Sequence, residues 1–240
     1  MENNPLIDKL FSVGAHFGYS PSRRHPSISR FIFGQKGGME LFDLEQTAKL
    51  LEEALAVVKS LAAERKVILF VGGKAEAKAA VTRTAQMLNQ PYSAGRWIGG
   101  TLTNWQEIKK RLNRLAELTQ MREKGELVKF TKMERLLIDR DIADLELMFG
   151  GLKGMQKAPD ALFVIDPKAE SGAVAEANQL KIPVIALLNS DCNQAGVAHP
   201  IPANDSSRES IQFVLDEVGK TYLNNLGAVP AAAAPETPAK

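Results

Sequence analysis

The chain has 240 residues, of which 45% are hydrophobic and 24% charged, a composition typical of a globular protein with a buried core. Cys192 is the only cysteine, which excludes a disulfide framework and a zinc site built from cysteine pairs within one chain. The N-terminus shows no basic segment followed by an apolar run, and no stretch approaches the roughly 20 apolar residues that cross a bilayer. We therefore expect a cytoplasmic protein without a membrane partner.

The net charge of +2 conceals an uneven distribution along the chain. Residues 1–100 carry 13 basic and 9 acidic groups, residues 101–157 carry 12 and 9, and residues 158–240 carry 5 and 10. The first two segments are therefore net positive and the last is net negative. A basic front and an acidic back indicate that a polyanion binds one side of the molecule.

The first predicted elements surround a basic segment. A short amphipathic helix is expected over 5–13, followed by a flexible, glycine-containing loop over 14–38 and a short strand over 39–42. Asp43 can cap the next helix, with Gln46 three residues later completing a capping box. Apolar residues at helical spacing extend this helix to Leu61.

Strands and helices alternate after this helix. The nearly continuous apolar run over 66–71 is typical of a strand buried on both faces, and a helix over 75–88 follows. The alternation returns with a strand over 161–165, a helix over 169–180 and a strand over 183–188. A final helix begins at Ser206 or Ser207 and reaches about Leu223. This pattern predicts an α/β fold with a doubly wound parallel sheet.

The segment from 103 to 152 interrupts this alternation. Two runs have apolar residues at spacings of three and four, and each begins with a predicted capping box, Thr103 with Gln106 and Thr131 with Glu134. Narrow apolar stripes favour a hairpin that packs on itself and projects from the body, and two helices lying on the sheet are the alternative. The predicted domains are an α/β body over 1–102 and 153–227, a helical hairpin over 103–152 and a disordered tail over 228–240.

Little in the sequence indicates catalysis. The three histidines are scattered, and Cys192 near His199 is more simply a semi-buried thiol and a loop histidine than a catalytic pair. Gly72-Gly73-Lys74 follows a strand and precedes a helix, but the first glycine and the hydroxyl residue of a phosphate loop are missing. We expect no enzymatic activity, no small-molecule substrate, no metal and no cofactor. A nucleotide- or phosphosugar-using enzyme with its site at 72–74 is the alternative, and an adaptor that binds proteins through the hairpin is a third class.

The cations indicate RNA binding instead. Arginine forms bidentate contacts with phosphates, and a lysine beside a helix N-terminus can add another. The glycine-rich segment 95–105 allows close backbone approach, and its tryptophans, Trp97 and Trp105, are expected to pack the base of the hairpin against the body. The candidate RNA-binding residues are Arg23, Arg24, His25, Arg30, Lys36, Lys74, Arg96, Asn104, Lys109, Lys110, Arg111 and Arg114.

Several motifs, in this order along the chain to about Leu226, resemble the bacterial small-subunit ribosomal protein S two family. The most specific are Arg96-Trp97-Ile98-Gly99-Gly100-Thr101-Leu102-Thr103-Asn104-Trp105 and Pro159-Asp160-Ala161-Leu162-Phe163-Val164-Ile165-Asp166. The resemblance implies a flavodoxin-like, three-layer α/β/α domain with an inserted coiled-coil hairpin and no catalytic activity. It also implies a structural constituent of the small ribosomal subunit that binds 16S ribosomal RNA between head and body. The implied partners include other small-subunit proteins. Among them is ribosomal protein S one, whose docking such a constituent supports, and with it messenger-RNA recruitment.

The chain departs from the family pattern at several places, among them the acidic C-terminal extension of many relatives, which is expected to be replaced by a short Ala/Pro tail. Arg24-His25-Pro26 stands where the family usually has Trp-Asn-Pro, and Gly73 stands where threonine is usual. The loop over 189–196 lacks most of the carboxylates and the proline of its relatives. An ion or a contact held by that acidic loop is therefore not carried over to this chain.

Overall fold

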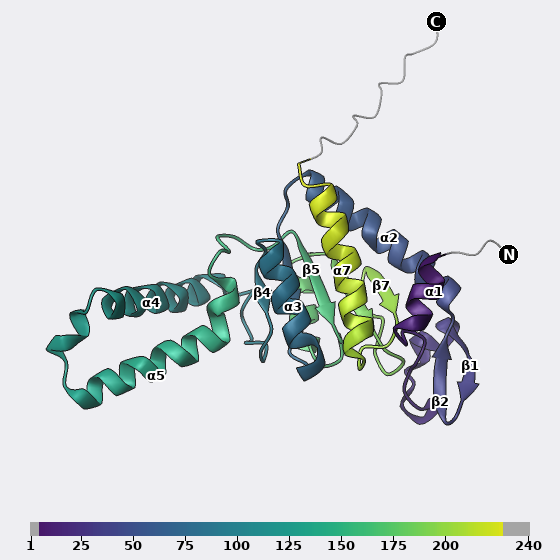
Figure 1. Cartoon of the computed structure of the whole chain (residues 1–240), viewed down its shortest axis with the longest axis horizontal. Helices are drawn as coiled ribbons and strands as arrows, with labels where there is room; N and C mark the ends of the chain where they lie inside the picture. The colour runs from purple at the N-terminus through teal and green to yellow at the C-terminus, as the bar shows by residue number, and fades with distance from the viewer. Residues whose placement is uncertain (1–4, 228–240) are drawn as a thin grey trace, which may run out of the picture.

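The computed structural model describes residues 5–227, and the predicted tail over 228–240 lies outside the described residues (Figure 1). Five strands form one parallel sheet: β3 (Ile68–Val71), β4 (Tyr92–Ser93), β5 (Ala161–Ile165), β6 (Val184–Leu188) and β7 (His199–Pro202). Their spatial order is β4-β3-β5-β6-β7, so the first of these strands lies between the second and the third. This is the flavodoxin-like order of a doubly wound sheet and confirms the predicted fold class.

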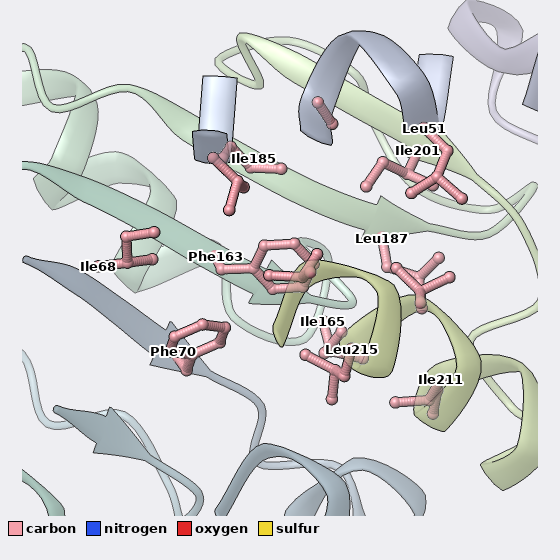
Figure 2. Close-up of a cluster of buried hydrophobic side chains, with 14 of the residues drawn as sticks. Leu51, Ile68, Phe70, Phe163, Ile165, Ile185, Leu187, Ile201, Ile211 and Leu215 are labelled. Atoms are coloured by element: carbon pink, nitrogen blue, oxygen red, sulfur yellow. The ribbon is translucent and has the colours of Figure 1, made fainter. Parts of the chain in front are cut away.

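The three central strands are buried at every residue because helices cover both faces of the sheet. On one face, alternate side chains such as Phe70, Phe163 and Leu187 pack against the helices α2 (Leu44–Ala63), α3 (Ala75–Met87) and α7 (Arg208–Asn224) (Figure 2). On the other face, the intervening side chains, including Leu69 and Val164, pack against α6 (Ser171–Gln179) and the base of the hairpin. The result is three layers.

The two edge strands are not predicted by the sequence. β4 has two residues, too few for a detectable pattern, and β7 contains Pro200 and Pro202. Proline lacks the N–H that a central strand must donate, so a segment with two prolines does not resemble a strand. β7 tolerates them because it pairs only with β6, on one side.

The N-terminal lobe is more ordered than the predicted flexible loop. It contains α1 (Pro5–Ser12), two short 3-10 helices (Pro21–Arg23 and Pro26–Phe31) and β1 (Ile32–Lys36), which pairs antiparallel with β2 (Met39–Phe42). Ile28 is 0% and Phe31 4% exposed, and both pack beside Leu188 of the central sheet. Burial of these two side chains fixes the second half of the segment, so the expectation of a loop over 14–38 is wrong there.

The cap of α2 differs in detail from the predicted capping box. The Asp43 carboxylate accepts the backbone N–H groups of Glu45 and Gln46, as expected for an N-cap. The Gln46 amide donates to the Asp43 carboxylate, at 2.8 Å, rather than returning to its backbone. The reason is that the Asp43 N–H is already bound to the Phe31 carbonyl oxygen.

The predicted hairpin consists of α4 (Trp105–Glu123), the 3-10 helix η3 (Glu126–Lys129), α5 (Lys132–Phe149) and the 3-10 helix η4 (Gly150–Leu152). It projects from the body, and Leu115, Leu118 and Ile142 are buried between its helices (Figure 1). The capping box of Thr131 and Glu134 is confirmed. The box predicted at Thr103 is wrong, because α4 begins one residue later and Thr103 instead bonds to Glu176 of α6.

Candidate nucleic-acid interface

Most of the candidate RNA-binding residues form two groups, on segments that lie at opposite edges of the central sheet (Figure 1). One group belongs to the N-terminal lobe, and the other lies on α4 and the segment before it. RNA that touches both groups must therefore extend across the body. The groups are Arg23, Arg24, His25, Arg30 and Lys36, and then Arg96, Asn104, Lys109, Lys110, Arg111 and Arg114.

Arg23, Arg30 and Lys36 are exposed candidate cations of the N-terminal lobe, and Arg30 Nη2 donates a hydrogen bond to Oε1 of Gln194 at 2.9 Å. The guanidinium carbon of Arg23 lies 5.5 Å from the centre of the Tyr19 ring, and that of Arg30 lies 4.6 Å from the centre of the Phe31 ring. Stacking on rings orients a guanidinium and leaves its charge available to an anion. None of these three forms an ion pair with another described residue.

Arg24 and His25 have partners inside the lobe. Arg24 Nη1 lies 3.0 Å from Oε1 of Glu40, whose side chain is buried. His25 Nδ1 accepts the Ser27 N–H at 3.3 Å and caps a 3-10 helix, and the His25 N–H donates to the Ser190 carbonyl oxygen at 2.8 Å. His25 therefore has a structural role, and Glu40 partly neutralises the charge of Arg24.

The second group presents its charge to solvent. Arg96, Lys109, Lys110, Arg111 and Arg114 are all exposed. Within this group, only Lys110 forms an ion pair with a described residue, 2.6 Å from Glu107. Asn104, also exposed, is the N-cap of α4 but its side chain forms no cap hydrogen bond. This end of α4 is a compact, largely uncompensated positive surface.

Lys74 lies beside the first group, with its Nζ 5.8 Å from the centre of the Tyr19 ring that Arg23 also contacts, and it belongs to a cluster at the carboxyl ends of the strands. Its Nζ lies 3.0 Å from Oδ2 of Asp205, 3.2 Å from Oδ2 of Asp166 and 3.3 Å from the Tyr19 hydroxyl oxygen. The Asn189 amide donates to the other oxygen of Asp205 at 2.7 Å. Burial favours the neutral amine, but the two carboxylates outweigh it and raise the pKa of Lys74 above its ordinary value. Its charge is balanced inside the protein.

The turn that resembles a phosphate loop is filled by the protein itself. The Gly73 N–H, just before the N-cap of α3, donates to Oε1 of Glu170 at 2.9 Å. Glu170 is buried, which raises its pKa despite this hydrogen bond. A Cβ at Gly73 would meet the Gly95 carbonyl oxygen at 2.5 Å, so the turn is packed tightly. A carboxylate occupies the position that a phosphate would need, which argues against a nucleotide site.

Asp166, Asp205 and Cys192 are the one described group whose donor atoms are close enough to hold a metal ion, within 4.8 Å of one another. Burial raises the pKa of the Cys192 thiol above its usual value, and its Sγ lies 3.6 Å from Asp166. The Lys74 ammonium already bonds both carboxylates and acts as their cation. The donor set therefore does not fit a divalent ion, and Cys192 contacts Asp166 rather than His199.

Glu176 of α6 is a site that the sequence reasoning missed. Its carboxylate accepts the Trp97 indole N–H at 3.0 Å, the N–H groups of Gly100, Leu102 and Thr103 at 2.8, 2.9 and 3.1 Å, and the Thr103 hydroxyl at 3.1 Å. Burial would raise the pKa of Glu176, but these donors hold it below its ordinary value. The glycines of the segment indicate that its backbone can wrap around an anion. The anion is the Glu176 carboxylate, which lies more than 70 residues away in the sequence.

The two tryptophans have the structural role expected of them. Both are part-buried and pack on the cluster that includes Leu102 and Phe149, between the hairpin and the sheet. The Trp105 indole N–H donates to the Gln156 carbonyl oxygen at 3.2 Å, which ties the start of α4 to the chain that leaves the hairpin.

An aromatic patch of Phe11, Phe17 and Phe33 covers one side of the N-terminal lobe. These rings are 62%, 38% and 80% exposed. Phe11 stacks on His16 with ring centres 4.6 Å apart, and Phe17 lies against the same ring at 4.0 Å. A hollow of about 380 Å³ beside the patch is lined by Phe11, His16, Phe33, Leu41, Phe42, Asp43, Leu44 and Glu45. Clustered exposed aromatic rings mark a surface for a partner rather than for solvent.

The fold and its surfaces define an α/β protein with a helical arm that carries exposed cations at its base, and with no catalytic constellation among the described residues. Comparison with known proteins identifies the class. A family model described as ribosomal protein S2 matches residues 10–225. The small ribosomal subunit proteins uS2 of Ruegeria sp. (strain TM1040) and Helicobacter hepaticus are 39% and 40% identical to this chain, over 94% and 89% of it and 88% and 81% of their own lengths. That of Roseobacter denitrificans is 38% identical over 94% of this chain and 86% of its own length.

The chain belongs to the ribosomal protein S2 family. It is a structural, non-enzymatic constituent of the small ribosomal subunit and works in translation on the cytoplasmic ribosome. Neighbouring ribosomal RNA and ribosomal proteins are its partners. Within residues 5–227, none of the helices combines the length and apolar character needed to span a bilayer.

Proposed function

We propose that this protein binds 16S ribosomal RNA between the head and the body of the small subunit, through the exposed cations of its N-terminal lobe and of the base of its hairpin. The observation that carries the proposal is the set of uncompensated cations on α4 and the segment before it. An exposed cation that lacks a carboxylate partner loses little on binding a phosphate, and it releases counterions from the RNA. The N-terminal lobe contributes Arg23, Arg30 and Lys36, with a weaker contribution from Arg24.

In this proposal the hairpin over 103–152 is a separate RNA-binding arm of the body over 1–102 and 153–227. Lys74 and His25 support the surface from inside, since both side chains have partners within the protein. Asn104 can reach RNA as a neutral donor and acceptor next to the arginines.

Filter binding to a fragment of 16S ribosomal RNA, between low and moderate salt, tests the proposal. Each phosphate contact contributes roughly 0.7–0.9 to the slope of log affinity against log salt. Arg111→Ala/Arg114→Ala should therefore reduce that slope by about 1.4–1.8. Lys59→Ala/Lys220→Ala, which removes equal charge from exposed positions on α2 and α7, is the matched control and should leave the slope unchanged. A flat salt response of the unaltered protein would contradict the proposal.

We also propose that the aromatic patch docks ribosomal protein S one and thereby supports messenger-RNA recruitment. Its support is the area of exposed rings beside a hollow, on the lobe that lies farthest from the hairpin (Figure 1). Phe33→Ala should weaken co-sedimentation of ribosomal protein S one with small subunits, because it removes the most exposed ring. The control is Met87→Ala, which removes an exposed apolar side chain from α3. Equal retention in the two variants would refute this assignment.

A further inference from the structure

The Glu176 carboxylate is surrounded by donors from a single segment, residues 97–103. Five donors reach it, two on Oε1 and three on Oε2, all between 2.8 and 3.1 Å. None of the described cationic side chains forms an ion pair with it. Its charge is thus balanced by N–H and O–H dipoles, and Gly100, at φ +87°, gives the backbone the bend that brings its amides together.

Glu176 itself stands on a rigid support. The helix α6 packs on the sheet through Ala173, Val174 and Ala177, which are at most 8% exposed. The Trp97 ring lies close against α6, since a Cβ at Gly172 would be 3.3 Å from its Cδ1. The carboxylate is therefore fixed relative to the body, and the segment that wraps around it is fixed in turn.

The wrapped segment leads directly into the hairpin. α4 begins at Trp105, and its N-cap, Asn104, forms no side-chain cap hydrogen bond. The usual local device that fixes the start of a helix is thus missing. Instead, the backbone N–H groups of Leu102 and Thr103, just before this N-cap, donate to the Glu176 carboxylate. The direction in which α4 leaves the body depends on an element that is distant in sequence.

A small change of direction at this point moves the cations by a distance that matters for binding. α4 has 19 residues, a length of about 28 Å at 1.5 Å per residue. A rotation of about 15° at its base displaces the far end by about 7 Å and the cations of Lys109 to Arg114 by about 2–4 Å. A displacement of that size breaks a hydrogen-bonded contact with a phosphate.

We propose that Glu176 is a positioning residue for RNA binding: its carboxylate locks the start of α4 and so holds the cations of the hairpin at a fixed place relative to the body. The inference rests on the proposed RNA-binding function. Glu176→Gln removes the lock with little change in shape, because an amide NH2 group then faces N–H donors that need an acceptor.

The experiment measures RNA affinity and hairpin direction together. Glu176→Gln should weaken binding of the 16S fragment by about tenfold, although it removes one negative charge and so makes the protein more positive. Glu209→Gln, the same change at an exposed position of α7 without a side-chain partner in the described chain, should stay within twofold. Glu176→Asp should rescue part of the loss.

Spin labels at Val128→Cys, on the tip of the hairpin, and Met87→Cys, on the body, report the direction of the arm. The distance distribution should be narrow in the unaltered protein and broad in Glu176→Gln. If Glu176→Gln does not fold, Trp97→Phe/Thr103→Val, which removes two of the five donors, replaces it in both measurements.

Two failures are distinguishable. A salt-independent interaction of the unaltered protein with RNA contradicts the proposed function. Salt-dependent binding that is the same in Glu176→Gln and the unaltered protein, with an unchanged distance distribution, overturns the positioning role alone.

Discussion

Replacing Lys74 with methionine should lower the free energy of unfolding by about 3–5 kcal/mol, the usual cost of removing one partner from a buried ion pair. Asp205 is 0% exposed and Asp166 9%, and Lys74 is within 3.2 Å of a carboxylate oxygen of each. Methionine keeps the apolar stem, so the effect is chiefly the loss of the cation.

The loss should depend on pH. Burial already raises the pKa of Asp205, and without Lys74 the folded state binds a proton there more readily still. The unfolded chain releases that proton near the ordinary value of 3.8. The penalty is therefore absent below that value, grows as the pH rises and is complete above the raised pKa of the folded state. We expect a larger loss at pH 8 than at pH 5.

Urea unfolding followed by tryptophan fluorescence measures both effects. With a slope of about 3 kcal/mol/M, the midpoint should fall by about 1–2 M at pH 8. Lys220→Met, which breaks an exposed ion pair with Glu217, should cost less than about 1 kcal/mol. Lys74→Met/Asp205→Asn should recover part of the stability, because it removes a carboxylate together with its cation. A loss below about 1 kcal/mol that is equal at both pH values would refute the buried cluster as an ionic network.

Three further results are expected. Gly151→Ala should lower the free energy of unfolding by about 1–3 kcal/mol in a urea titration, because its Cβ would lie 2.2 Å from the Tyr92 carbonyl oxygen. Gly154→Ala, whose Cβ would have nothing within 4 Å, should not destabilise the protein. Equal effects of the two substitutions would contradict the packing argument. Thr131→Ala should speed amide exchange in the first turn of α5 and lower the free energy of unfolding by about 1 kcal/mol. Thr131→Ser should restore both values. Unaltered exchange in Thr131→Ala would count against the capping box. Burial lowers the pKa of His16 below 6.5, so NMR should show its ring titrating below that value. The protein should lose stability as the pH falls through this range, because the unfolded chain binds the proton more readily. A titration midpoint above 6.5 would contradict the burial of this ring.

Much of the fold could be predicted because its signals are local. The runs over 68–71, 161–165 and 184–188 are apolar at every residue, which in a short segment requires cover on both faces. The narrow stripes of the hairpin likewise predicted two helices that pack on each other. The prediction failed at β7, which forms a strand because of its edge position although its residues have low strand propensity. It also failed over 26–36, where burial of Ile28 and Phe31 orders the chain.

The candidate RNA-binding residues show the same division. Charge and spacing along one helix predicted the exposed cations of α4, because neighbours in a helix are set by sequence alone. Nothing local showed that Lys74 is neutralised by carboxylates 92 and 131 residues away, or that Glu176 binds a segment 73 to 79 residues before it.

Local patterns therefore sufficed to predict the three central strands, the hairpin and the sign of the charge on each part of the chain. Which of these charges stay exposed and unpaired depends on the three-dimensional fold. A charge is neutralised by whichever groups the fold brings within about 4 Å, and at the carboxyl edge of a parallel sheet those groups come from loops that are far apart in sequence.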